Sequence, residues 1–176
     1  MNHHDHVRLL QRGVPQKGGV WADLGSGQGA FTLALAELVG ETATIYSVDK
    51  NRQALRRQKT AMQAQFSRVT LHTQVADFTR PLSLPLLDGI VMANSLHFVR
   101  NKRPLLINLR RYLKENGRLL IVEYNTDRGN MWVPHPFSYS TWETLAANAG
   151  FAHTKKLATQ PSRFLGEMFS AMSLSS

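Results

Sequence analysis

Residues 20–31 read VWADLGSGQGAF, and this stretch decides the fold. An apolar run ends in Asp23, and glycine then occupies every second position, at Gly25, Gly27 and Gly29. Glycine costs backbone entropy on folding, so three glycines in five residues need a physical reason. A turn whose backbone must come close to a ligand supplies that reason. We therefore expect a ligand-binding turn directly after a buried strand.

The glycines fit two kinds of ligand. Gly25-x-Gly27-x-x-Ala30 matches the dinucleotide fingerprint, and Asp49 then lies where the ribose-binding acid is expected. In the other fit, Asp23 precedes the first glycine by two residues. A carboxylate there adds like charge beside a pyrophosphate, where a helix N-terminus should attract an anion. It suits a ligand that has a cationic group and no phosphate.

Strand-like and helix-like segments alternate along the rest of the chain. The predicted strands are 19–24, 44–48, 68–73, 86–94 and 117–124, and the predicted helices are 30–39, 51–66, 105–113 and 140–150. Ser140 and Glu143 form a capping box for the last helix. Two final strand-like runs, 151–158 and 164–172, flank the sequence TQPS and predict an antiparallel hairpin. In such sheets ligands bind at the carboxyl ends of the strands.

Length and composition limit the classes that the chain can belong to. Its 176 residues, 43% of them hydrophobic, fit one domain, 1–176, in which 1–17 form an N-terminal segment that could cover the site. The absence of cysteine excludes disulfides, thiolate metal sites and cysteine nucleophiles. There is no membrane-length apolar run and no secretory h-region, so a cytoplasmic location is expected.

The chain is strongly basic, with 21 Lys+Arg against 12 Asp+Glu and a formal charge of +9. Such an excess can attract nucleic acid or other anions. The basic residues are scattered over several predicted helices, with one group at 52–59 and another at 110–114. Tyr112 is the one aromatic residue within these two groups, which falls short of the interleaved rings that a base-stacking surface requires. A solvated basic surface explains the excess equally well.

Taken in order, these segments resemble the class I S-adenosylmethionine-dependent methyltransferases. ADLGSGQG looks like their first motif, YSVDKN like their second-strand acid motif and VADF like the stretch that holds the adenine. LDGIVMANSLHFV resembles their fourth-strand motif, and LRRYLKENGRLLIVEY their following helix, glycine turn and fifth strand. The resemblance implies a Rossmann-like, doubly wound α/β fold. Its sheet would have seven mostly parallel strands and end in the antiparallel hairpin.

The resemblance also implies a set of residues that bind S-adenosyl-L-methionine. Glycine N–H groups would approach its methionine part, Asp23 its ammonium, Asp49 its ribose hydroxyls, and Asp77 with Phe78 its adenine. Asp49 could also cap the following helix, and Asp77 could be a turn residue. The full predicted set is Asp23, Gly25, Ser26, Gly27, Gly29, Asp49, Lys50, Ala76, Asp77, Phe78, Asn94, Ser95 and Leu96.

Methyl transfer is an in-line displacement, and a base is needed only if the acceptor must lose a proton. His97 is the candidate base, because it follows the fourth strand and its type of side chain titrates near neutrality. It could equally be a packing histidine. Tyr124, Trp132 and His135 are candidates for the substrate side, with the loop 125–139 as a possible lid. The terminal cluster of histidines at 3–6 is not predicted to be a metal site.

The acceptor is expected to be a small molecule, with a possible homodimer as the assembly. An RNA or other macromolecular acceptor is the alternative, although NSLH stands where amino-group methylating enzymes have an NPPY-type motif. The lack of cysteine argues against the arsenic-methylating branch. A nicotinamide-dependent oxidoreductase and a non-catalytic cofactor-binding module are the remaining hypotheses.

Overall fold

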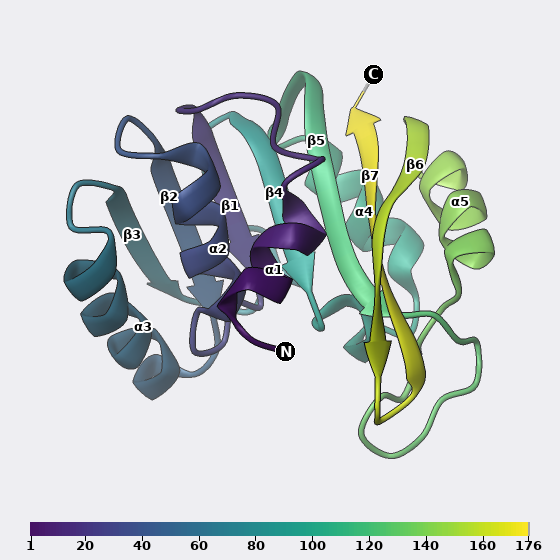
Figure 1. The fold of residues 1–176 in the computed structure, drawn as a ribbon. Coiled ribbons are helices and arrows are strands. Elements are labelled where there is room, and N and C mark those ends of the chain that lie inside the picture. The colour runs from purple at the N-terminus through teal and green to yellow at the C-terminus, as the bar shows by residue number, and fades with distance from the viewer. Residues whose placement is uncertain (176) are drawn as a thin grey trace.

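A computed structural model describes residues 1–175 as a seven-stranded sheet with helices on both faces (Figure 1). The strands lie in the order β3-β2-β1-β4-β5-β7-β6. The helices are α1 (His3–Leu10), α2 (Ala30–Val39), α3 (Arg52–Gln65), α4 (Lys102–Arg110) and α5 (Tyr139–Asn148), with a short 3-10 helix, η1 (Leu96–Phe98). The strands are β1 (Val20–Leu24), β2 (Thr44–Asp49), β3 (Thr70–Val75), β4 (Leu87–Ala93), β5 (Leu113–Tyr124), β6 (Phe151–Ser162) and β7 (Gly166–Ser175).

The pairing of the strands confirms the predicted sheet. The first five strands, β1 to β5, run parallel to one another. The strand β7 is antiparallel to both β5 and β6. The order reverses at β1, which lies between β2 and β4. Ligands of such sheets bind outside the carboxyl ends of the strands at this reversal, and here the glycine turn follows β1. This edge of the sheet points downward in Figure 1.

Two apolar clusters cover the two faces of the sheet. One contains Leu35 of α2 and Met62 of α3, together with Leu9 and Leu10 of α1. The other contains residues of α4 and α5, with Trp142 fully buried. In Figure 1, α1 crosses in front of the sheet and α4 lies behind it. None of the helices described in residues 1–175 is both long and apolar enough to cross a bilayer.

The connection between β3 and β4 contains no helix, as the two prolines of 76–86 predict. Leu82 and Leu84 of this segment instead pack against the cluster of α4 and α5. The backbone N–H of Leu82 donates to the Tyr112 hydroxyl at 2.8 Å, which ties the segment to the end of α4. The carboxyl end of β3 therefore has only a short coil beside it.

Three predicted boundaries are wrong. The N-cap of α5 is Ser138, whose hydroxyl accepts from the Thr141 N–H, so Ser140 lies inside the helix and the box of Ser140 and Glu143 is not the cap. The sequence TQPS belongs to β6, and the hairpin turns at 163–165. The predicted helix 105–113 begins at Lys102 and ends at Arg110, because the chain enters β5 already at Leu113.

Candidate functional site

The glycine turn is held by backbone bonds to the next strand. The N–H groups of Gly25 and Ser26 both donate to the Val48 carbonyl, at 2.8 and 3.2 Å. All three glycines have positive φ, at 77° for Gly25, 54° for Gly27 and 90° for Gly29, which side chains rarely tolerate. A Cβ at Gly25 would lie 2.5 Å from Ser95 Cβ, whereas a Cβ at Gly27 would meet no atom within 4 Å. The turn is thus closed on the β4 side and open at its centre.

A chain of polar groups supports the turn from inside the protein. Thr32 donates to the Asp23 carboxylate at 2.5 Å and accepts from the Gln58 side-chain amide. The Gln58 carbonyl oxygen accepts from the Ser47 hydroxyl at 2.8 Å, and Ser47 contacts Ser26 of the turn at 2.7 Å. The chain joins β1, α2, α3 and β2 beneath the glycines, so it fixes the shape of the turn.

Asp23 is almost completely buried at the end of β1, with 1% of its surface exposed. The pKa of this carboxyl group is raised to about 7, because burial raises it strongly, the hydrogen bond from Thr32 lowers it in part, and the charge of Asp49 raises it slightly. The group therefore changes charge near neutral pH. It lies at the carboxyl end of β1, where the strand order of the sheet reverses.

Asp49 ends β2 and faces the same turn. Its Oδ2 accepts from the Gly27 N–H at 2.8 Å, and its Oδ1 accepts from the Asn51 N–H at 2.7 Å. The alternative role as helix cap is wrong, since the N-cap of α3 is Asn51, whose side chain accepts from the Gln53 and Ala54 N–H groups. A carboxylate has about four acceptor positions, so Asp49 retains capacity for further donors.

The predicted adenine residues lie after β3. Asp77 Oδ1 accepts from the N–H and hydroxyl of Thr79, and its Oδ2 pairs with Lys50 Nζ at 2.9 Å. The hydrogen bonds from Thr79, followed by that from Lys50, lower the pKa of Asp77 to about 2. Asp77 is thus a turn residue and an ion-pair partner. Phe78 lies beside the turn, its Cε1 3.1 Å from the position a Gly25 Cβ would take.

The end of β4 contacts the glycine turn directly. The Ser95 hydroxyl donates to the Leu24 carbonyl at 2.9 Å, and Leu96 is fully buried in the core. Asn94 has φ of 52°, in the left-handed region, and its Oδ1 is buried without a hydrogen-bond partner among the described residues. Such an atom costs free energy unless a donor reaches it, so Asn94 offers an acceptor to a ligand.

His97 and Glu123 form a buried pair behind this strand end. His97 Nδ1 lies 2.6 Å from Glu123 Oε2, and the two side chains are 4% and 0% exposed. Glu123 Oε1 also accepts from the backbone N–H groups of Ser95, Leu96 and His97 at 3.2, 2.8 and 3.2 Å. Four donors therefore surround one carboxylate and fix the loop that carries the histidine.

Lys102 and the loop 125–138 close this region from the side. Lys102 Nζ donates to the carbonyls of Val99 and His135, each at 2.8 Å, and the His135 N–H donates to the His97 carbonyl at 3.1 Å. Burial lowers the pKa of Lys102, and the attraction of Glu123 opposes that shift. His135 is thus joined to His97 through the backbone.

Aromatic rings continue from His97 to the outside of the protein. Tyr124 lies 6.3 Å from His97 and 5.8 Å from Phe164 between ring centroids, and Phe98 lies 4.3 Å from His97 on the other side. Phe98 is 61% and Phe164 51% exposed. We call Phe164, Tyr124, His97 and Phe98 the ring row. Burial and the Glu123 charge raise the pKa of Tyr124.

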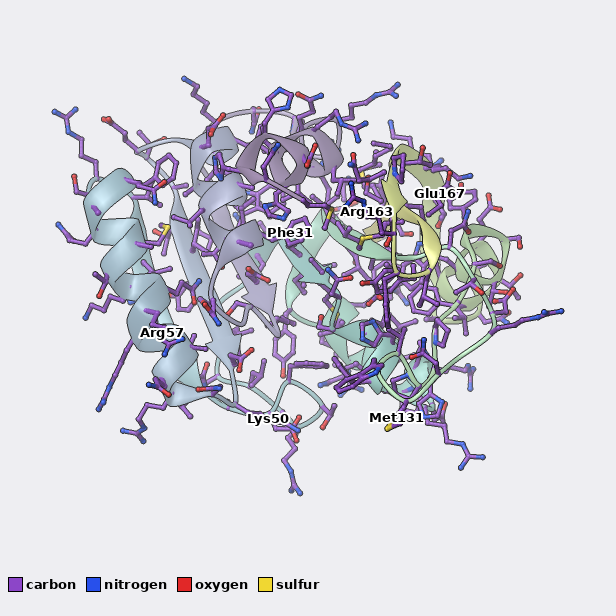
Figure 2. The ribbon with its side chains drawn as sticks, turned by 60° about the horizontal axis from the view of Figure 1, so that its bottom comes forward. Phe31, Lys50, Arg57, Met131, Arg163 and Glu167 are labelled. Atoms are coloured by element: carbon purple, nitrogen blue, oxygen red, sulfur yellow. The ribbon has the colours of Figure 1, made fainter. Side chains whose placement is uncertain are left out.

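Trp132 is not part of the ring row. It is 71% exposed, next to Met131, which is 87% exposed and projects from the loop in Figure 2. The rest of the loop is fixed, because Val133 and Phe137 are buried and the Ser138 N–H donates to Asp127 at 2.9 Å. Lys50 projects from the same edge of the sheet in Figure 2.

Two of the three histidines at the N-terminus contact neighbouring side chains, and His4 is exposed. His3 Nε2 lies 2.6 Å from Glu37 Oε2, and the His6 ring lies 4.7 Å from that of Phe31. Within residues 1–175 there is no group of three or more His, Cys, Asp or Glu side chains arranged to hold a metal ion.

Residues 15–170 match the family described as a methyltransferase domain. The chain belongs to this family. The match spans the glycine turn, the end of β4 and most of the terminal hairpin. Among curated proteins, no match to this sequence was found.

Solved structures share the fold of this methyltransferase domain at low sequence identity. A SAM-dependent methyltransferase from Aquifex aeolicus has a TM-score of 0.75 and 19% identity, over 98% of this chain and 90% of its own. The YcgJ protein from Bacillus subtilis has a TM-score of 0.79 and 13% identity, over 98% and 99%. An arsenic(III) S-adenosylmethionine methyltransferase from Chlamydomonas reinhardtii has a TM-score of 0.72 and 16% identity, over 90% and 64%.

Three residues of the methyltransferase domain escaped the sequence analysis: Gln58, Lys102 and Glu123. Gln58 interrupts the apolar inner face of α3 between Leu55 and Met62. A polar residue at such a position indicates a buried hydrogen-bond partner, and the sequence could have been interpreted in this way. Glu123 also stands out, as an acid inside an apolar strand. Lys102 gave no signal, because its contacts come from a loop distant in sequence.

Proposed function

We propose that the protein is an S-adenosyl-L-methionine-dependent methyltransferase that acts on a small-molecule acceptor. The observation that carries the proposal is the glycine turn, which is open at Gly27 and lies between the acids Asp23 and Asp49. The membership of the methyltransferase domain family supports the same donor. The same membership favours this donor over the dinucleotide alternative, which rested on the glycine spacing and the position of Asp49.

The residues at this edge fit the chemical groups of that donor. Gly27 leaves room for its methionine part, and Asp49 has spare acceptor positions for ribose hydroxyls. Asp23 in its charged form favours an ammonium group nearby. Asn94 Oδ1 is a buried acceptor that still needs a donor. The remaining members of this side are Gly25, Ser26, Gly29, Ser95 and Leu96.

The adenine would lie toward the segment after β3, near Ala76 and Phe78. Both oxygens of Asp77 already accept hydrogen bonds, so an adenine amino group would compete with Lys50 for Oδ2. Lys50 is 67% exposed and can move away at little cost. We therefore retain Asp77 and Lys50 as adenine-side residues, with Asp77 released from its ion pair on binding.

When bound, the donor supplies an electrophilic methyl group. The chain orients the two reactants and keeps water away, which is enough to accelerate an in-line transfer. His97, Tyr124 and His135 lie together beyond the end of β4 and belong to the acceptor side of this proposal. Trp132 would contact an acceptor only from the exposed tip of its loop.

A small acceptor agrees with the apolar rim of the site. Phe98 and Phe164 expose ring surface there. The basic residues of α3 lie on a different part of the surface, as Arg57 shows in Figure 2. The helix α3 therefore does not combine base-stacking rings with its basic groups, as a nucleic-acid surface on this helix would require.

The test uses two measurements. Calorimetry with S-adenosylhomocysteine measures donor-site binding, with G27A as the variant that fills the open space. Labelled S-adenosylmethionine is then incubated with a cell extract separated into polar small molecules, lipid-soluble molecules, RNA and protein. Binding by the wild type alone, with label in a small-molecule fraction, supports the proposal. Absence of binding refutes the donor, and label in RNA refutes the acceptor class.

A further inference from the structure

We propose that His97 and Glu123 act together to remove a proton from the acceptor, and that the acceptor carries a hydroxyl group on a planar aromatic ring. This inference rests on the proposed function and names the acceptor chemistry of the same site. It is based on the geometry of the pair and on the ring row that leads to it.

The tautomer of His97 follows from its hydrogen bond. Glu123 Oε2 is an acceptor at 2.6 Å from Nδ1, so Nδ1 carries the ring proton and the lone pair lies on Nε2. Nε2 has no hydrogen-bond partner in residues 1–175. Its lone pair is therefore available to a ligand. A neutral imidazole in this state can accept one proton at Nε2.

Glu123 is the positioning residue of the pair. Its carboxylate binds three consecutive backbone N–H groups with one oxygen and the imidazole with the other, so the ring is fixed to its own backbone loop. When Nε2 accepts a proton, the imidazolium lies against a negative charge that is already in place. Lys102 provides the balancing positive charge for the buried acid.

The ring row indicates the shape of the acceptor. Its outer members, Phe164 and Phe98, expose ring surface, and Tyr124 lies between Phe164 and His97. Aromatic faces and edges favour a planar apolar partner. A ring bound along the row would bring a substituent to His97. A hydroxyl group there must lose its proton to become a strong nucleophile, whereas a neutral amine attacks with its own lone pair and needs no base beforehand.

The hydroxyl oxygen of the acceptor forms a bond with the methyl carbon, and the carbon–sulfur bond of the donor breaks with its electron pair left on sulfur. The hydroxyl proton goes to Nε2 of His97 and from there to water. The products are an aryl methyl ether and S-adenosylhomocysteine, and no oxidant or metal is needed.

The test uses 4-nitrophenol, whose phenolate absorbs at longer wavelength than the phenol, together with the complex of the protein and S-adenosylhomocysteine. Since no methyl group is present, the spectrum reports proton transfer alone. With wild type, we expect the phenolate-to-phenol ratio of bound probe to exceed that of free probe by about tenfold or more, since a neighbouring cation favours the phenolate. H97Q should abolish the increase while the complex still forms.

E123Q separates positioning from structure. Gln keeps the size of Glu and an acceptor for the three backbone N–H groups, but it donates to Nδ1, so the imidazole proton moves to Nε2. The phenolate increase should then be lost although the protein stays folded. H4Q, at an exposed histidine of α1, is the matched control and should behave as wild type. If E123Q does not fold, the result for H97Q decides.

The outcomes are distinct. A phenolate increase that survives in H97Q or in folded E123Q refutes the pair. If S-adenosylhomocysteine binds but 4-nitrophenol does not, the aromatic acceptor is refuted and the proposed function stands. If S-adenosylhomocysteine does not bind, the proposed function itself is refuted. Loss of probe affinity in F164A, with cofactor affinity unchanged, would support the ring row as the acceptor surface.

Discussion

Replacing Asp23 by Asn should remove the contribution of this carboxyl group to the pH dependence of the free energy of unfolding. Asp23 is 1% exposed, and Thr32 is the one side-chain donor to its carboxylate among residues 1–175. Asn has nearly the same shape and can still accept from Thr32. The substitution therefore removes the titration while leaving the packing under the glycine turn close to its original form.

The sign and size follow from the pKa of the folded state. Burial raises the pKa of Asp23 from 3.8 to about 7. Between these values the folded protein keeps a proton that the unfolded chain has lost, so its stability falls as the pH rises from about 4 to about 7. At about 1.4 kcal/mol per pH unit, the contribution is about 4 kcal/mol. Above pH 7 the loss is complete.

Urea denaturation of wild type and D23N at several pH values between 4 and 8 measures this contribution. The difference between the two free energies of unfolding is the quantity to compare, because other carboxyl groups titrate equally in both proteins. Asp77, for example, has a lowered pKa in the folded protein. The charged Asp77 therefore stabilises the fold above about pH 4, and this contribution is lost as the pH falls below about 4. A wild-type-minus-D23N difference that stays constant across the range would refute the reasoning.

Further substitutions should separate stability from binding. G29A places a Cβ 2.4 Å from Gln58 Cγ at a φ of +90°, so the free energy of unfolding in urea should fall by about 1–3 kcal/mol or more. G27A meets no atom within 4 Å and should keep more of the stability, yet lose S-adenosylhomocysteine affinity in calorimetry; unchanged affinity would contradict an open ligand site there. D49N should weaken that affinity about tenfold to a hundredfold, as expected for one hydrogen bond to a charged group, and wild-type affinity would exclude Asp49 as a ligand. W132A should reduce turnover in the labelled-methyl assay more than cofactor affinity, and the reverse order would count against an acceptor-side role.

The sheet was predictable because its signals are local. The glycine turn, the alternation of apolar strands with amphipathic helices and the short connection over 76–86 each depend on neighbouring residues. The boundaries were less predictable, because competing signals lay within a few residues of one another. Ser138 and Ser140 both suit an N-cap, and the packing of Phe137 in the core selects the earlier serine.

The candidate residues that follow the ends of strands could be predicted from the sequence. The contacts between side chains that are distant in sequence could not. The sequence indicated the turn and the two strand-end acids, because the glycines and these acids lie directly after apolar strand-like runs. It did not indicate that Gln58 would reach Thr32 or that Glu123 would reach His97, since these pairs lie 26 residues apart in sequence. The packing of helices and loops against the sheet brings them together.

Two buried acids flank the end of β4, and the number of donors around each carboxylate differs. Glu123 receives four hydrogen bonds, three of them from backbone N–H groups that cannot move away. Asp23 receives one side-chain hydrogen bond, so burial dominates and raises its pKa to about 7. Donors offset the cost of burying a charge, and Asp23 has one side-chain donor, so its protonation state can respond to a ligand. A cationic ligand group that binds beside Asp23 favours its charged form, so Asp23 should lose its proton on binding. Below pH 7, S-adenosylhomocysteine binding should then release a proton in wild type and not in D23N, which calorimetry in buffers of different ionisation enthalpy can detect.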